Sequence, residues 1–281
     1  MNRPVETAAS DPAALTAADA WERLLGIRSL AGAEAAGLVR GTDGVHRWDR
    51  DATHEAGVLA RRYLPLCLAG PHTTFAQLGQ SIDGFIATRT GDADYVTGAE
   101  DRLHLHRLRA LADAVVVGAG TATADDPRLT VRACAGSHPV RVVLDPRGRV
   151  PQGLQVFTDG AAPTLWLVGA GHEPGGRVAA GVEVVSLPDA DAFAPHRLVR
   201  TLARRGLGRV LVEGGGVTVS RFLHEKVLNR LYVTVAPVLL GDGVPGLRFT
   251  GEAVMRDALR PPVRRFTLGE DTLFEMELGS G

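Results

Sequence analysis

The stretch Arg209-Val-Leu-Val-Glu-Gly-Gly-Gly-Val-Thr218 decides the fold of this chain. Residues 210–213 are predicted to form a short buried strand, because valine and leucine suit a covered, pleated surface. Three glycines follow, and a helical pattern extends from Thr218 to about residue 227. A strand that turns through bare backbone into a helix N-terminus offers N–H groups and a positive dipole end to an anion. The stretch therefore indicates a phosphate site beside Glu213, although a tight turn that requires glycine explains the same letters.

Alternating strands and helices surround this turn. Strands are expected at residues 73–79, 114–117, 140–144, 164–168, 182–186 and 232–237, and helices at residues 99–112, 175–180 and 194–205. The end of the chain has the pattern of an antiparallel hairpin, with strands 264–268 and 272–278 joined across residues 269–271. Parallel crossovers followed by a hairpin predict the α/β class, with a mixed, mostly parallel sheet and helices on both faces.

The first 72 residues differ in composition from the rest, being rich in alanine, leucine, arginine and glutamate. Helical patterns cover about residues 17–25 and 53–62, and either Thr16 or Asp19 could cap the first. A Gly-Pro pair at residues 70–71 precedes the first clear strand. We therefore expect a helical N-terminal extension (1–72) and an α/β domain (73–281). The sequence of the extension does not decide whether it covers a site, extends an interface or does neither.

The bulk composition is that of an ordinary globular protein, with 45% hydrophobic and 22% charged residues among 281. A formal net charge of −1 gives no electrostatic reason to expect nucleic acid or an anionic membrane as partner. No apolar run reaches the roughly 18 residues of a membrane span, and the first residues lack the core of a signal peptide. A cytoplasmic protein with Cys67 and Cys134 as free thiols is expected.

Two further segments place polar residues at strand ends. Residues 77–87 read as a strand broken at Asp83 and the following glycine, so Asp83 is either a turn former or a functional acid. Residues 115–132 pass from a buried strand into a glycine turn and a polar loop with Asp125 and Arg132. The glycine spacing is not that of a dinucleotide fingerprint, and no helix of the right length is expected there. Ligands of open α/β sheets bind at such strand ends, and a guanidinium suits a phosphate, although a solvated surface arginine fits the pattern equally.

Together these segments resemble the reductase half of the bifunctional riboflavin-biosynthesis deaminase/reductase family, which has a dihydrofolate-reductase-like fold. The matching stretches are SIDGFIA, VTG, LHRLRALADAVVVGAGTATADDPRLTVR, PVRVVLDPRGRVP, VLVEGGG and APVLLGDG, in the family order from about Phe75 to Gly243. Nothing in the chain looks like the zinc signature of the deaminase half, an HxE segment followed by PCxxC. The resemblance is thus to a stand-alone reductase, and no metal site is expected.

The resemblance implies an NADPH-dependent oxidoreductase of riboflavin biosynthesis, similar to 5-amino-6-(5-phosphoribosylamino)uracil reductase. In that reaction the ribosyl ring opens to an imine, and hydride transfer to C1′ gives a ribityl chain. The implied cofactor-binding residues are Gln80, Tyr95, Thr121, Asp125, Gly214, Gly215, Gly216, Val217 and Thr218, and the implied substrate-binding residues are Arg109, Leu129, Arg132 and Glu213. The candidate catalytic residues are Asp83 and Glu213, either as proton donor or as holder of a water that donates. The family also implies a homodimer.

Three positions depart from the family pattern. Ala93 stands where many members have serine, Tyr95 replaces tryptophan, and Gln77 lies where lysine is common. Loss of one hydroxyl contact costs about 0.5–1.5 kcal/mol, which indicates a related but different substrate rather than lost activity.

Two alternatives therefore stay open: a reductase of another heterocycle, of dihydrofolate or specialised-pathway type, and a nucleotide-binding regulator without turnover. Ala93 and the N-terminal extension favour the regulator, whereas the intact Asp83, Glu213, triple glycine and Arg132 oppose it. The sequence does not identify the arginine that would read the 2′-phosphate of NADPH.

Overall fold

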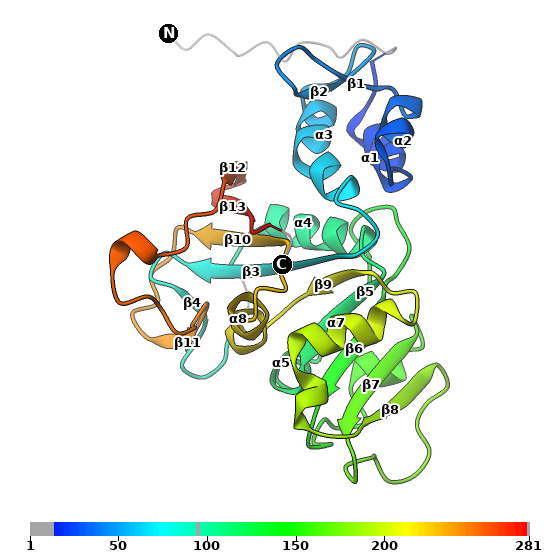
Figure 1. The fold of residues 1–281 in the computed structure, drawn as a ribbon, viewed down its shortest axis with the longest axis vertical. Helices are drawn as coiled ribbons and strands as arrows, with labels where there is room; N and C mark the ends of the chain where they lie inside the picture. The colour runs from blue at the N-terminus through cyan, green and yellow to red at the C-terminus, as the bar shows by residue number, and fades with distance from the viewer. Residues whose placement is uncertain (1–13, 94–95, 280–281) are drawn as a thin grey trace, which may run out of the picture. The chain divides into compact units, whose positions relative to one another are not determined.

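The computed structural model describes residues 14–93 and 96–279, and the chain divides after Pro71 into two compact units (Figure 1). The first unit contains helices α1 (Ala17–Leu25), α2 (Leu30–Ala35) and α3 (His54–Cys67), with strands β1 (Leu38–Arg40) and β2 (His46–Trp48). The strands pair as an antiparallel hairpin, which the sequence did not predict. Thr16 caps α1 and Asp19 completes a capping box. The Trp21 and Tyr63 rings pack edge to face, 5.2 Å apart, inside this unit.

The second unit is built on a sheet in which nine strands lie in the order β12-β13-β10-β3-β9-β5-β6-β7-β8 across the described part of the chain. These strands are β3 (Thr73–Ser81), β5 (Ala114–Gly118), β6 (Val140–Asp145), β7 (Thr164–Gly169), β8 (Val182–Leu187), β9 (Arg209–Val212), β10 (Arg230–Ala236), β12 (Val263–Leu268) and β13 (Asp271–Glu277). Strand β13 pairs antiparallel with β10 and with β12, and the other neighbours are parallel. The predicted mixed sheet with a terminal hairpin is confirmed.

Helices cover both faces of this sheet, as the sequence predicted. The helices of the second unit are α4 (Ala99–Ala110), α5 (Ala119–Asp125), α6 (Gln155–Thr158), α7 (Pro195–Ala203) and α8 (Gly216–His224), with 3-10 turns at η1 (Ala190–Phe193) and η2 (Met255–Asp257). Successive strand residues point to opposite faces. Val212 therefore packs with Phe222 of α8 in the core cluster that also holds residues of α7. On the other face, the His104 ring of α4 lies 5.3 Å from the Tyr232 ring of β10.

Three local expectations were wrong. The helix expected at residues 175–180 does not form, because two adjacent glycines favour turns and Gly176 has a φ of +82°. A short helix, α5, follows β5 where a loop was expected, since its alanines favour helix. Helix α8 begins at Gly216 and ends at His224, earlier at both ends than predicted. A small antiparallel pair, β4 (Phe85–Thr88) with β11 (Gly243–Pro245), was also not predicted.

Candidate active site

A cleft of about 1280 Å³ lies at the carboxyl ends of β3, β5 and β9. Its walls come from α4, α5 and the start of α8, together with the segment 244–250. Pockets for drug-sized ligands span about 300–1,000 Å³, so this cleft has room for a dinucleotide and a second small molecule. The carboxyl edge of a parallel sheet is where open α/β folds bind ligands, because loops and helix N-termini gather there.

The triple-glycine turn forms the floor of the cleft between β9 and α8. Gly214 has a φ of +93°, and a Cβ there would lie 2.6 Å from Thr121 Cγ2. The N–H of Gly215 donates to Thr121 Oγ1 at 2.9 Å. Helix α8 then begins without a side-chain cap, so its first N–H groups and its positive dipole end face the cleft. Close packing therefore requires glycine at position 214, and the same turn leaves the start of α8 without a side-chain cap.

Arg109 and Glu213 form a buried, bidentate ion pair in the wall of the cleft. Arg109 Nε donates to Glu213 Oε1 and Nη2 donates to Oε2, both at 2.7 Å. The remaining guanidinium nitrogen, Nη1, donates to the Thr130 carbonyl at 3.1 Å. Both side chains are buried, with relative exposures of 7% and 4%. Because Arg109 donates to both carboxylate oxygens, Glu213 fixes the orientation of the guanidinium.

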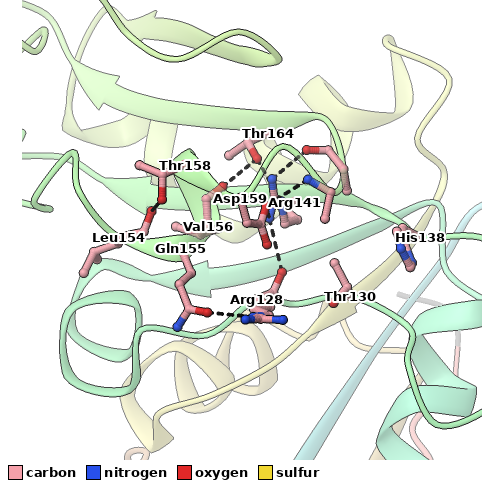
Figure 2. A network of polar contacts seen from close by, with 12 residues as sticks. Arg128, Thr130, His138, Arg141, Leu154, Gln155, Val156, Thr158, Asp159 and Thr164 are labelled. Atoms are coloured by element: carbon pink, nitrogen blue, oxygen red, sulfur yellow. Dashed lines mark hydrogen bonds and ion pairs between the residues drawn. The ribbon is translucent and has the colours of Figure 1, made fainter.

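The segment that leads to Leu129 and Arg132 rests on a polar network around Arg141 (Figure 2). The fully buried Arg141 donates to Thr164 Oγ1 at 2.9 Å and to Asp159 Oδ1 at 2.6 Å. It also donates to the Arg128 carbonyl at 3.4 Å, and Arg128 Nε donates to Gln155 Oε1 at 2.6 Å. These contacts fix the backbone before Leu129, which adopts a φ of +56° and lines the cleft. A strained backbone held by its surroundings is common at binding sites.

Arg132 lies on the surface beyond the lining of the cleft. Its Nη1 donates to Thr130 Oγ1 at 2.6 Å, and its backbone N–H donates to His106 Nδ1 at 3.1 Å. Burial, then the charges of Arg109 and Arg132, lowers the pKa of His106 to about 4. The imidazole is therefore neutral near pH 7, as its acceptor role requires. The arginines around it make this side of the molecule attractive to an anion.

Asp83 holds a turn and does not line the cleft. Its Oδ1 accepts from the Ser81 hydroxyl at 2.6 Å, and Oδ2 accepts from the Gly241 N–H at 2.7 Å. The Leu240 N–H donates to the same carboxylate. The hydrogen bond from Ser81, followed by those from the backbone, lowers the pKa of Asp83. An acid so stabilised in its ionised form is a poor proton donor.

The cleft brings together most of the residues expected from the sequence. Those in its lining are Arg109, Thr121, Asp125, Leu129, Glu213, Gly214, Gly215, Gly216, Val217 and Thr218. Gln80, Asp83 and Arg132 lie beyond the lining, and Tyr95 falls outside the described residues. Of the three positions that depart from the family pattern, Gln77 and Ala93 line the cleft.

The sequence reading missed Asp101, a buried acid in the cleft wall with a relative exposure of 3%. Thr234 Oγ1 donates to its Oδ1 at 2.6 Å, and Gln77 Nε2 lies 3.3 Å from both carboxylate oxygens. Burial raises the pKa of Asp101, and the like charge of Asp271 adds to that rise. An acid in the first turn of a helix is usually explained by the helix dipole, so the sequence held no signal of this environment.

Among the described residues, no group of three or more histidine, cysteine, aspartate or glutamate side chains is placed to hold a metal ion. Within the same residues, none of the helices combines the length and the apolar character needed to cross a bilayer.

The fold and the site define the class of protein: an α/β domain with a ligand cleft at the carboxyl edge of its sheet. The chain belongs to the family described as the RibD C-terminal domain, which matches residues 73–268. It is 37% identical over 206 residues to the 2,5-diamino-6-ribosylamino-4(3H)-pyrimidinone 5′-phosphate reductase of Methanothermobacter thermautotrophicus, a match that covers 69% of this chain and 93% of the relative. The riboflavin biosynthesis protein RibD of Bacillus amyloliquefaciens is 34% identical over 203 residues, covering 70% of this chain and 54% of that protein. Membership in this family makes the chain an oxidoreductase.

Solved structures agree with this assignment. A deaminase/reductase from Thermotoga maritima, named as acting on diaminohydroxyphosphoribosylaminopyrimidine and 5-amino-6-(5-phosphoribosylamino)uracil, matches with a TM-score of 0.62 and 25% identity, over 79% of this chain and 60% of that one. The riboflavin biosynthesis reductase Rib7 of Saccharomyces cerevisiae has a TM-score of 0.57 over 73% of this chain and 89% of its own. At 19% identity the second match supports the fold alone. The chain therefore spans about half to two thirds of the bifunctional relatives and nearly all of the archaeal reductase.

Proposed function

We propose that this chain is an NADPH-dependent reductase that converts the ribosyl group of a phosphorylated ribosylamino-pyrimidine into a ribityl chain, a step of riboflavin biosynthesis. One observation carries the proposal: a single cleft joins the uncapped start of α8 to the buried pair of Arg109 and Glu213. The first suits a cofactor diphosphate, and the second suits the polar edge of a heterocycle. The relatives named above act on pyrimidines of this type.

The residues of the glycine turn fit a dinucleotide. Glycine at 214 and 216 allows close packing against Thr121 and the Gly246 carbonyl, and the N–H groups at the start of α8 would hold a diphosphate. Thr121 and Thr218, which also line the cleft, add hydroxyls. When bound, NADPH supplies the hydride. The protein contributes the position of the acceptor carbon, which must lie about 3–3.5 Å from the donor.

The substrate's phosphate and pyrimidine would occupy the arginine side of the cleft. Arg109 presents a guanidinium whose direction Glu213 determines. Arg132 and Arg128 add positive charge at the adjoining surface, where a ribose phosphate could be bound by guanidinium forks. Ala93 leaves an apolar spot in the same wall, consistent with a substrate that differs slightly from that of serine-bearing relatives.

We further propose a cytoplasmic homodimer. Large apolar side chains are exposed along the segment before β12, where Leu239, Met255 and Leu259 have relative exposures of 73%, 75% and 60%. Strand β12 is the edge of the sheet, and exposed apolar surface beside a free edge favours association with a second copy. Met255→Asp together with Leu259→Asp should turn a dimer into a monomer by sedimentation velocity; a wild-type monomer would contradict the proposal.

The decisive experiment follows NADPH oxidation with two substrates, 5-amino-6-(5-phosphoribosylamino)uracil and its 2,5-diamino-pyrimidinone counterpart. We expect turnover with at least one of them and none with dihydrofolate. Turnover only with dihydrofolate would instead support a reductase of another heterocycle. Tight NADPH binding without oxidation in any case would favour the regulator and overturn the proposal.

Arg132→Ala tests the phosphate contact. The variant should raise KM for the pyrimidine by about tenfold, the effect of losing roughly 1.4 kcal/mol of binding, while NADPH affinity stays unchanged. Arg197→Ala, on the exposed side of α7, is the matched control and should leave both constants unchanged. An equal change in the two variants would place the phosphate elsewhere.

A further inference from the structure

A buried carboxyl faces the reaction space at the start of α4. The side chains that line the cleft from this helix include Asp101, Leu105 and Arg109, which are spaced four residues apart and therefore share one face. Eight residues of helix separate the two ends of this row by about 12 Å. A phosphoribosylamino-pyrimidine bound along the row would extend from the Arg109 pair toward Asp101.

Asp101 lines the cleft, and its two carboxyl oxygens have different neighbours. Oδ1 accepts from Thr234 of β10, and Oδ2 lies on the side of Gly79 in β3. Gln77 Nε2 lies 3.3 Å from both oxygens. Thr234 and Gly79 are paired in register across the two strands. A Cβ on Gly79 would lie 3.4 Å from Oδ2 and 2.8 Å from the Thr97 methyl, so a larger residue at position 79 would crowd both side chains. Gly79 and Thr97 themselves line the cleft.

The neighbours of this carboxyl are mostly neutral. Gln77 approaches from β3, Thr234 from β10 and Thr97 from the segment before α4, each as a hydrogen-bond partner. Asp271 of β13 contributes a like charge, while its own Oδ2 accepts from the Gly98 N–H at 2.7 Å. Arg102, the next residue on α4, donates at 3.4 Å to the Thr97 carbonyl. Desolvation and the like charge together raise the pKa of Asp101.

We propose that Asp101 is the proton donor of the reduction. The inference rests on the proposed function and adds the acid that the reaction consumes. The C1′–O4′ bond of the substrate breaks, its electron pair stays on O4′, and the proton of Asp101 Oδ2 converts that oxygen to the 4′-hydroxyl. The nitrogen lone pair closes a C=N bond, which becomes an amine when the hydride of NADPH adds to C1′. Solvent returns a proton to Asp101, so one hydride and one proton are consumed per turnover.

The other two acids of the site are unsuited to this role. Glu213 holds both oxygens on Arg109, and Asp83 is kept ionised by Ser81 and the backbone outside the lining of the cleft. Asp101 combines access to the cleft with an environment that favours the protonated form, which a general acid requires.

Asp101→Asn tests the proposal directly. Loss of the acid should lower kcat about 10²–10⁴-fold, with NADPH affinity by fluorescence titration unchanged. Asp113→Asn is the matched control. Asp113 directly precedes β5, lies outside the lining of the cleft, and accepts from the N–H groups of Gly208 and Arg209. This control should keep wild-type turnover.

The pH profile separates a proton donor from a structural acid. Wild-type kcat/KM should fall as pH rises through the raised pKa of Asp101, since the protonated form reacts. Asp271→Asn removes the like charge while its amide oxygen can still accept from Gly98, so the alkaline limb should move to lower pH at little cost in kcat.

A stability measurement gives a readout that is independent of turnover. Because the folded pKa of Asp101 is raised, its contribution is present at low pH and is lost as pH rises through that pKa. Asp101→Asn should therefore have a higher Tm than wild type above this pKa, and the difference should shrink toward acid pH.

The outcomes distinguish two kinds of failure. An active wild type with an equally active Asp101→Asn variant, or with an alkaline limb that Asp271→Asn does not move, overturns the role of Asp101 alone. A wild type that oxidises no NADPH with either pyrimidine overturns the proposed function and this inference with it.

Discussion

At the scale of single residues, the partners of each carboxyl group determine whether it has a structural or a chemical role. Glu213 and Arg109 are buried, and each is the other's bidentate partner. Glu213→Gln should cost about 3–5 kcal/mol of unfolding free energy, because it leaves the Arg109 charge buried and uncompensated. The double variant with Arg109→Met should cost less than the sum of the single changes. Urea unfolding measures this coupling, and strictly additive losses would contradict it.

Asp83 is expected to behave in the opposite way from Asp101. Its carboxylate ties the turn after β3 to the N–H groups of Leu240 and Gly241. Asp83→Asn should therefore lower Tm and leave most NADPH oxidation intact, whereas Asp101→Asn should lower turnover and raise Tm at alkaline pH. Thermal scans and steady-state rates on both variants check this crossed result. A large loss of turnover without loss of stability in Asp83→Asn would restore Asp83 to the chemistry.

At the scale of elements, packing against Thr121 of α5 restricts which residues the turn between β9 and α8 can contain. Gly214→Ala would force an alanine to a φ of +93° and place its Cβ against Thr121. Strain of this kind costs about 1–3 kcal/mol, and we expect lower stability together with weaker NADPH binding. Gly153→Ala is the matched control, since a Cβ there meets nothing within 4 Å. Calorimetric titration with NADPH would show the difference, and unchanged affinity in Gly214→Ala would exclude this turn from the cofactor site.

At the scale of the whole molecule, the two units have separate cores. Trp21, Leu24 and Tyr63 are buried in the first unit, while the cleft is lined entirely by residues 77–250 of the second. A chain that begins at His72 should therefore fold, bind NADPH and retain reductase activity, because the contacts that form the cleft are kept. Circular dichroism and the oxidation assay test this. An unfolded or inactive truncated chain would show that the first unit is needed for the second.

The local sequence pattern determined much of this protein. Valine-rich runs, the triple glycine after residue 213 and the terminal hairpin each depend on neighbours in the chain, so the α/β class could be predicted. The family was predicted from the resemblance of the stretches between Phe75 and Gly243 to known members. The same local reasoning failed at residues 175–180, where two adjacent glycines favour turns over the expected helix. It also failed at α5, where alanines favour a helix over the expected loop. Most of the expected cleft residues also gather in one place because parallel strands end at one edge.

Only the tertiary structure decided the state of each acid. Asp101 meets its partner Thr234 across 133 positions of sequence, and Arg109 meets Glu213 across 104. These encounters depend on the order and register of strands, which local periodicity does not encode. A carboxyl in a sequence carries an ordinary pKa; burial, hydrogen bonds and neighbouring charges in the fold determine whether it stays protonated. The sequence by itself therefore determined the fold, the family and the glycine turn. The structure moved the proposed proton donor from Asp83 to Asp101.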